Sequence, residues 1–307
     1  MNSESFILIP ENLAITEPKA ELLDLINSKE FSDKILFEKE SAFHTISVVE
    51  NEVGRFIHFK DTYQAGFINT PFYSGNLPYI NYFLIPYLMN KKIKKVLLIG
   101  LGTGKIISDY AKLFDKLDRV DVVDIEENIL EIAKDYFGFK EPENFNFYLQ
   151  DGCAFLRNTR KKYDLIVVDV ANNEGIDGRF LEQEYLQSVK KCLSKDGIFV
   201  SNLCSSAHLD HKKNKFFKSI LNLYKKNFNA VHVYKGDFSD KVYYKSFFDI
   251  EERVIDITNV ILISSDKEYL SDCSKNTLLE NLTAEDENKF NSLGVNIDNY
   301  LEDIYSC

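Results

Sequence analysis

KKVLLIGLGTGKIISDYAKL, residues 94–113, contains the change of pattern that decides the fold of this chain. The apolar run from Lys94 to Gly100 has the composition of a buried strand, and helical spacing begins at about Lys105. Between them stand Gly100, Gly102 and Gly104, which let the backbone turn tightly and pass close to a bound group. The spacing is GxGxG followed by lysine, which differs from the dinucleotide fingerprint GxGxxG, so the turn alone is weak evidence for a ligand.

The chain after this turn alternates between strand-like and helix-like segments. Such alternation is typical of a parallel sheet with crossover helices, a doubly wound α/β fold. The predicted strands are Lys94–Gly100, Arg119–Asp124, Phe145–Leu149, Tyr163–Asp169, Gly197–Leu203, Ala230–Tyr234 and Thr258–Ser264, and the predicted helices are Lys105–Phe114, Glu127–Phe137, Gly152–Asn158, Glu182–Leu193, Lys212–Asn227 and Thr277–Leu293.

The chain before the turn has a different pattern, with dense aromatic and β-branched residues that alternate. Phe43–Glu52 and Arg55–Asp61 predict a hairpin with Gly54 in its turn. A helix is expected at Lys19–Ser28, and an apolar helix at Pro78–Met89. We therefore expect a small antiparallel β domain with its linking helix over residues 1–90 and an α/β domain over residues 91–307.

Composition excludes several classes of protein. The 307 residues are 45% hydrophobic and carry a formal net charge of −11, which is ordinary globular composition and disfavours non-specific nucleic-acid binding. The apolar runs are too short for a membrane span, and because the first residues have no basic segment and only a short apolar run, we expect no signal peptide. Five scattered cysteines without a CxxC pair suit a cytoplasmic protein. His208 and His211 have metal-ligand spacing, but no third ligand is evident, so we expect no metal.

Three aspartates follow the first predicted strands of the α/β region. Asp124 ends one strand and can accept hydrogen bonds from both ribose hydroxyls of an adenosine. Asp151, followed by Gly152, can accept from an adenine amino group, and Asp169 can take a proton from a nucleophile or hold a cationic substrate. Each could instead cap a helix. Because ligands bind at the carboxyl edge of open α/β sheets, the three together favour an adenosine-type ligand.

In order and spacing, these segments resemble the spermidine synthases, or polyamine aminopropyltransferases, and their spermidine synthase-like relatives. The resemblance covers about Phe37 to Ser206. In the first region it rests on ESAFHTISVVENEVGRFIHFKDTYQAG, and in the second on VLLIGLGTG, VDVVDIEENILEIAKDYFG, LQDGCAFL, KKYDLIVVDVANNEGI and LEQEYLQSVKKCLSKDGIFVSNL. It implies a class I S-adenosylmethionine-methyltransferase-like sheet behind the small β domain. The implied reaction moves an aminopropyl group from decarboxylated S-adenosylmethionine to a diamine such as putrescine and releases methylthioadenosine. A homodimer is also implied.

The resemblance also implies roles for individual residues. Asp169 faces the attacking amine, and Tyr79 resembles the tyrosine of a gatekeeping helix. Asn172 takes the position of the second aspartate in the family's DxxD loop. The implied donor-binding residues are His44, Gln64, Gly100, Gly102, Thr103, Gly104, Asp124, Ile125, Asp151 and Gly152, and the implied acceptor-binding residues are Asn172 and Glu174. Tyr79, Glu174, Asp177 and Tyr243 are all candidates for holding the far ammonium of a diamine.

Two differences from the family pattern leave other functions open. The family's glycine loop reads GGGDGG, and its aspartate, implied to recognise the donor's ammonium, is Thr103 here. Asn172 replaces the second acidic residue of the DxxD loop. Without a carboxylate at position 103, intact S-adenosylmethionine is not repelled. The alternatives are therefore a methyl- or aminocarboxypropyl-transferase that uses S-adenosylmethionine, and a non-catalytic adenosine-ligand binder.

Overall fold

The protein forms two sheets that are joined by a short buried helical segment. The computed structural model describes residues 32–52, 54–60, 62–69, 74–76, 78–170, 178–206, 214–235, 240–244, 253–267, 280, 282–295 and 304–305. The helix expected at residues 19–28 lies outside these ranges. No helix within them is both long and apolar enough to cross a membrane.

The first sheet is antiparallel and follows chain order. Its strands are β1 (Lys34–Glu40), β2 (Thr45–Glu50), β3 (Gly54–Phe59), β4 (Thr62–Asn69) and β5 (Ser74–Asn76). The predicted hairpin is confirmed as β2 and β3, and Gly54 lies in its turn, where its carbonyl oxygen accepts from the Asn51 N–H at 2.9 Å; it also begins β3 by pairing with Ile68 of β4. A Cβ atom there would stand 2.1 Å from the Phe67 carbonyl oxygen of β4, so close strand pairing requires glycine at this position.

The link between the sheets is almost wholly buried. Pro78–Leu84 forms a 3₁₀ helix, η1, and Ile85–Met89 forms α2, where one continuous helix was predicted. Pro86 lies in the first turn of α2, where its missing N–H costs no hydrogen bond, so an α-helix can begin at Ile85.

The second sheet confirms the predicted α/β class. Its order is β14-β11-β13-β10-β9-β6-β7-β8, with β12 paired to β13 outside this order. The central strands from β8 to β10 are parallel, whereas β13 runs antiparallel to both β10 and β11. The strand bounds are β6 (Lys95–Ile99), β7 (Arg119–Asp124), β8 (Phe145–Leu149), β9 (Tyr163–Val168), β10 (Leu193–Ser206), β11 (Ala230–Lys235), β12 (Asp240–Tyr244), β13 (Arg253–Ser265) and β14 (Ile304–Tyr305).

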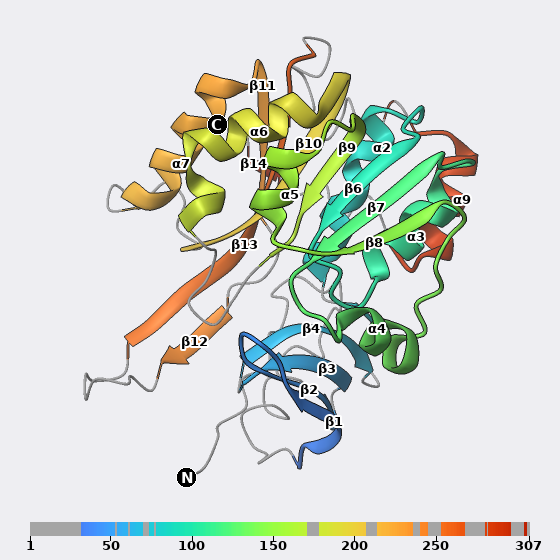
Figure 1. Cartoon of the computed structure of the whole chain (residues 1–307), viewed down its shortest axis with the longest axis vertical. Coiled ribbons are helices and arrows are strands. Elements are labelled where there is room, and N and C mark those ends of the chain that lie inside the picture. Colours follow the sequence, from blue (N-terminus) through green and yellow to red (C-terminus); the bar gives the residue numbers. More distant parts are fainter. Residues whose placement is uncertain are drawn as a thin grey trace.

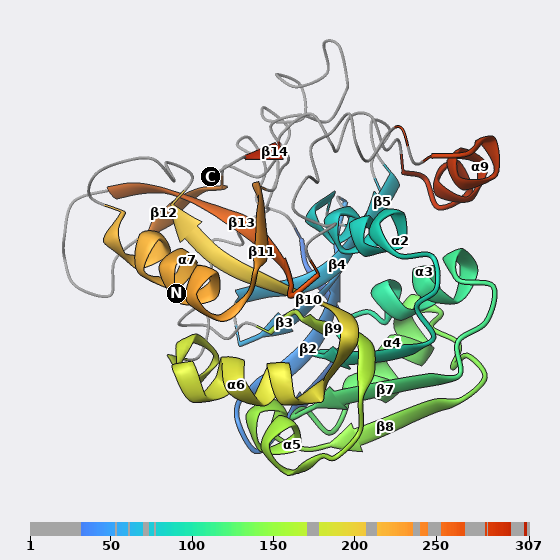
Figure 2. The same ribbon diagram turned by 90° about the horizontal axis from the view of Figure 1, so that it is seen from above.

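Helices cover both faces of this sheet (Figures 1 and 2). On one face α3 (Lys105–Leu113) and α4 (Ile129–Phe137) share a buried cluster with Val96 and Leu98 of β6. On the other face α5 (Gly152–Asn158), α6 (Gln183–Cys192) and α7 (Lys215–Asn227) pack with Leu97 and Ile99. Strands buried on both faces explain the continuous apolar runs in the sequence.

The C-terminal third differs most from prediction. The strand β13 is longer than Thr258–Ser264, and β12 and β14 were not predicted. Within the predicted helix Thr277–Leu293, residues 277–279 and 281 lie outside the described ranges, and Ala284–Ser292 forms α9. Its start is fixed by a capping box in which Thr283 and Asp286 satisfy each other's backbone N–H groups.

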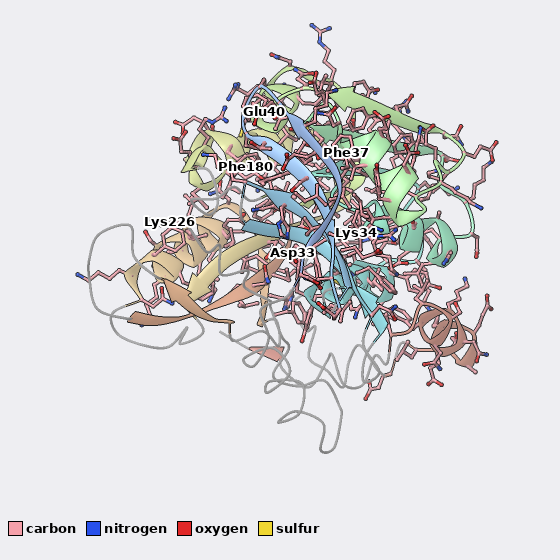
Figure 3. The ribbon with its side chains drawn as sticks, turned by 90° about the horizontal axis from the view of Figure 1, so that it is seen from below. Asp33, Lys34, Phe37, Glu40, Phe180 and Lys226 are labelled. Atoms are coloured by element: carbon pink, nitrogen blue, oxygen red, sulfur yellow. The ribbon has the colours of Figure 1, made fainter. Side chains whose placement is uncertain are left out.

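The two sheets share one hydrophobic core. Ile46, Val48 and Ile57 of the first sheet belong to the same buried cluster as Val96 and Leu98 of the second. The strand β1, along which Figure 3 labels Lys34, Phe37 and Glu40, packs on α4 through a ring contact of 5.9 Å between Phe37 and Tyr136. The first sheet is therefore anchored against the carboxyl-edge side of the second.

Candidate functional site

The glycine turn after β6 has a backbone that only glycine adopts easily. Gly100, Gly102 and Gly104 have φ values of 91°, 54° and 78°. A Cβ atom on Gly100 would stand 2.1 Å from the Asp169 carbonyl oxygen, and one on Gly104 would stand 2.5 Å from the Phe139 ring. The turn therefore brings the end of β6 directly against the end of β9.

Asp124 at the end of β7 holds this turn in place. Its Oδ2 accepts from the Leu101 N–H at 2.7 Å, and its Oδ1 accepts from the Glu126 N–H at 2.9 Å. Burial raises the pKa of the Asp124 carboxyl, and the two backbone hydrogen bonds lower it. Next to it Ile125 is 40% exposed, an apolar surface at the sheet edge that could lie against a planar ring.

Asp151 is a helix cap, as its alternative interpretation supposed, but it also has a second partner. Its Oδ1 accepts from the Ala154 N–H at 2.7 Å and so caps α5. Its Oδ2 lies 3.0 Å from Nη1 of Arg179 in the 3₁₀ helix η2 (Gly178–Leu181). Gly152 is packed against Ile99, where a Cβ atom would stand 2.4 Å from Cγ2. Sequence reasoning missed Arg179 because the fold, and no motif, brings it to Asp151.

Asp169 follows β9 and is hydrogen-bonded by side chains from two other elements. Tyr79 of η1 donates to its Oδ2 at 3.4 Å, and Asn202 of β10 donates to its Oδ1 at 2.9 Å. Burial raises the pKa of this carboxyl to about 6, although both hydrogen bonds lower it. A carboxyl with such a pKa can be ionised at neutral pH and can still take up a proton, which suits a general base.

The first sheet contributes His44 and Gln64 to the same side of the molecule. His44 Nε2 lies 3.5 Å from the buried Glu126 Oε2, and the His44 ring packs on Phe59 with centroids 3.9 Å apart. Burial lowers the pKa of His44, which Glu126 opposes. Gln64 lies in β4 beside Ala65. A Cβ atom added to Gly102 would stand 3.5 Å from the Ala65 Cβ, so this part of β4 lies close to the glycine turn. Glu126 was not predicted, although it stands two residues after Asp124.

The remaining predicted residues are less well defined. Thr103 lies in the glycine turn and is partly buried. Asn172, Glu174 and Asp177 lie outside the described residues, and Tyr243 is placed by its backbone in β12. Within the described part, no group of three or more His, Cys, Asp or Glu side chains is arranged to hold a metal ion.

The fold thus places three carboxylates at consecutive strand ends beside a glycine turn. Asp124 belongs to β7, Asp151 follows β8 and Asp169 follows β9. The middle of this edge, at Gly100, is the point from which the sheet is extended in both directions, β6 to β8 and β6 to β10. Ligands of open α/β sheets bind at such a switch point. The arrangement can hold a nucleoside by its hydroxyl and amino groups and present it to a basic carboxylate.

Comparison with known proteins gives one consistent family. The family model described as "Spermine/spermidine synthase domain" matches residues 83–236. A polyamine aminopropyltransferase of Clostridium botulinum (strain Eklund 17B / Type B) is 30% identical over 174 residues, which are 55% of this chain and 59% of that protein. The match therefore covers less than two thirds of that relative's length.

Solved structures agree on the fold. The spermidine synthase from Thermotoga maritima aligns with a TM-score of 0.61 and 18% identity, over 84% of this chain and 79% of that chain. Human methyltransferase-like protein 13 aligns with a TM-score of 0.52 and 23% identity, over 71% and 93% of the two chains. At these identities the likeness supports the fold class and says nothing of the substrate.

Proposed function

This chain belongs to the spermine/spermidine synthase domain family, and from that membership we propose that it transfers an aminopropyl group from decarboxylated S-adenosylmethionine to a small diamine such as putrescine. The observation that carries the proposal is Asp169, a largely buried carboxylate at the carboxyl edge of the sheet, hydrogen-bonded by Tyr79 and Asn202. No metal takes part in the proposed reaction.

The proposed reaction needs a proton acceptor. A neutral amine nitrogen attacks the carbon beside the sulfonium, the new N–C bond forms, and the C–S bond breaks. The electron pair of the broken C–S bond goes to sulfur, and methylthioadenosine leaves as a neutral thioether. An alkyl amine has a pKa of about 10.4, so it must lose a proton to react. Asp169 is placed to accept this proton, and Tyr79 to orient its oxygen Oδ2.

The nucleoside half of the donor would lie along the strand ends of β7 and β8. Asp124 is the proposed acceptor for the ribose hydroxyls, and the exposed apolar side chain of Ile125 is the proposed surface for adenine. Asp151 would accept a hydrogen bond from the adenine amino group. Because Asp151 Oδ2 already lies beside Arg179, the amino group and Arg179 would share this oxygen. His44 and Gln64 would close the site from the first sheet.

A second candidate is a transferase that uses intact S-adenosylmethionine. It is favoured by Thr103, an uncharged residue in the glycine turn, which would not repel the carboxylate of that donor. Calorimetric titration with both donors distinguishes the candidates. The first candidate requires tighter binding of the decarboxylated donor, and tighter binding of intact S-adenosylmethionine would exclude it. Binding of neither donor would exclude both.

Turnover is the direct test of the proposed reaction. The protein is incubated with decarboxylated S-adenosylmethionine and putrescine, and spermidine and methylthioadenosine are measured by mass spectrometry. The two products should appear in equal amounts. Asp169→Asn should form neither above background while binding the donor as the native protein does. Assembly as a homodimer and a cytoplasmic location are further parts of the proposal, which size-exclusion chromatography and cell fractionation would test.

A further inference from the structure

We propose that Asn202 and Asn259 form a chain of amides that fixes the orientation of the Asp169 carboxylate, which makes Asn202 a positioning residue for the reaction. The proposal rests on the proposed function because it takes Asp169 as the proton acceptor. Asn202 lies at the end of LEQEYLQSVKKCLSKDGIFVSNL, one of the segments that resemble the family, but the sequence predicted no role for it, and Asn259 lies in a later strand outside those segments.

Strand register brings the three side chains together. In the parallel pair of β9 and β10, Val168 is opposite Ser201, so Asp169 and Asn202 are the next neighbours at the carboxyl edge. In the antiparallel pair of β10 and β13, Asn202 is opposite Ile261, and Asn259 is therefore its diagonal neighbour two residues away. Residues two apart in a strand share a face, so all three side chains project from the face that packs on η1.

Both N–H groups of the Asn202 side-chain amide donate hydrogen bonds to neighbouring side chains. Its Nδ2 donates to Asp169 Oδ1 at 2.9 Å and to Asn259 Oδ1 at 2.9 Å. If the amide were reversed, its oxygen would face the Asp169 carboxylate and the Asn259 oxygen, three acceptors without a proton between them. Asp169 and Asn259 therefore both favour the orientation in which Nδ2 of Asn202 meets the Asp169 carboxylate.

The two oxygens of the Asp169 carboxylate therefore have different roles. Oδ1 of Asp169 is held by Asn202, while among the described residues Oδ2 receives the longer hydrogen bond of 3.4 Å from Tyr79. Oδ2 is thus the oxygen with unused acceptor capacity for an incoming proton. The hydrogen bond from Asn202 also stabilises the ionised carboxylate against burial, which otherwise raises its pKa. Within the described part of the chain, Tyr79 is the titratable group hydrogen-bonded to this carboxyl.

Direct titration of Asp169 tests the chain of amides without any substrate. The full-length protein is labelled with ¹³Cγ-aspartate, and the Asp169 signal is identified by its loss in Asp169→Asn. We expect a midpoint near pH 6 in the native protein. Asn202→Ala should raise the midpoint by about one pH unit because it removes a donor to the ionised form. Asn259→Ala should raise it by less, because the donor stays but loses its fixed orientation.

Matched variants separate this effect from general damage. Asn227→Ala removes a similar amide pair, since Asn227 and Gln183 exchange hydrogen bonds of 2.8 and 2.9 Å between α7 and α6. It should leave the Asp169 midpoint unchanged. Asn202→Gln retains the amide donors and should recover part of the shift. An unchanged midpoint in Asn202→Ala, with a native spectrum elsewhere, would overturn the proposal.

Kinetics then link the positioning role to the reaction. With an active amine acceptor, Asn202→Ala and Asn259→Ala should lower kcat about tenfold or more with little change in the donor KM, and the acidic limb of the pH profile should move upward with the titration midpoint. Equal losses in Asn227→Ala would contradict this. A shifted midpoint in a protein that turns over no amine would refute the proposed function and leave the amide chain intact.

Discussion

The protonation state of Asp169 affects both the proposed reaction and the stability of the folded protein. Its pKa of about 6 lies above that of an aspartate in an unfolded chain, so folding favours its protonated form. The stability that protonated Asp169 contributes is present below the unfolded pKa of about 4 and is lost as the pH rises through about 6. At neutral pH the ionised carboxylate is therefore a cost to folding that the proposed reaction requires.

The first prediction concerns the isosteric variant Asp169→Asn. It should be inactive in aminopropyl transfer, yet at pH 8 it should be more stable by about 1–3 kcal/mol, since it removes a buried charge. Urea unfolding at pH 8 and at pH 5 measures this. The gain should shrink at the lower pH, where the native carboxyl is protonated. A variant that is less stable than the native protein at pH 8 would contradict the argument.

The second prediction is the pH dependence of the reaction. Because Asp169 must be ionised to accept a proton, kcat/KM should fall about tenfold per unit as the pH drops below about 6. Protonation of His44 is not expected to produce this limb, because burial lowers the pKa of His44 below its usual value. His44→Gln should therefore retain the limb, and its loss in that variant would assign the limb to His44.

The third prediction is that Gly100 is needed for space as well as for its φ value. Gly100 and Gly138 both have positive φ, but a Cβ atom on Gly138 would meet nothing within 4 Å. Gly138→Ala should cost about 1 kcal/mol, the strain of the backbone alone. Gly100→Ala should cost more than about 3 kcal/mol because its Cβ would overlap the Asp169 carbonyl. Equal losses in urea unfolding would contradict the close approach of β6 and β9.

Single residues were predictable where chemistry and strand ends coincide. Asp124, Asp151 and Asp169 could be identified because each follows an apolar run, and a carboxylate after a buried strand has a restricted set of uses. Arg179, Asn202 and Asn259 could not, since their roles depend on register and on the return of distant strands. The identity of an asparagine in a strand says nothing of its neighbour in the sheet.

At the scale of elements, the strands with clear local patterns were predictable, and the strands that form mainly through pairing were not. β6, β7 and β9 agree with prediction to within a residue or so because their sequences are largely apolar or β-branched, and the edge strand β8 agrees because its aromatic residues alternate with others. β12 and β14 are short and form through pairing with β13 and β11, so local sequence carries little signal for them. The start of α9 depends on its cap.

The fourth prediction concerns the attachment of α9. Asp286 is 3% exposed and accepts from Tyr87 Oη at 2.7 Å, from Lys91 and from the Thr283 backbone. These partners hold the pKa of Asp286 well below its usual range, so its contribution to stability is present above pH about 4 and is lost as the pH falls further. Asp286→Ala should cost about 2–4 kcal/mol, since it leaves the partners of a buried charge unsatisfied.

The matched control for this prediction is the ion pair between Lys289 of α9 and Asp115, which follows α3. The Asp115 side chain is 92% exposed and lies 3.1 Å from Lys289. Asp115→Ala should change the urea midpoint little, because solvent screens such pairs. If both variants lost the same stability, or if Asp286→Ala lost none at pH 7, the attachment would not depend on Asp286.

At the scale of the whole molecule, the first sheet is part of the structure around the glycine turn. Ala65 of β4 lies over Gly102, and Lys39 of β1 donates to Asn128 Oδ1 at 2.8 Å, beside the loop that follows Asp124. The sequence indicated two regions with different periods, and it gave no sign that their apolar residues merge into one cluster. Local patterns report the period of each element and not which elements meet.

The fifth prediction follows from that merged core. Because Ile46 and Ile57 of the first sheet pack in one cluster with Val96 and Leu98 of the second, the two sheets should unfold in a single cooperative transition. Methylthioadenosine at 100 times its dissociation constant should stabilise that transition by about 2.7 kcal/mol. Scanning calorimetry with and without the ligand measures both effects. Two transitions, of which the ligand moves only one, would mean that the sheets fold separately and that the first sheet takes no part in holding the nucleoside.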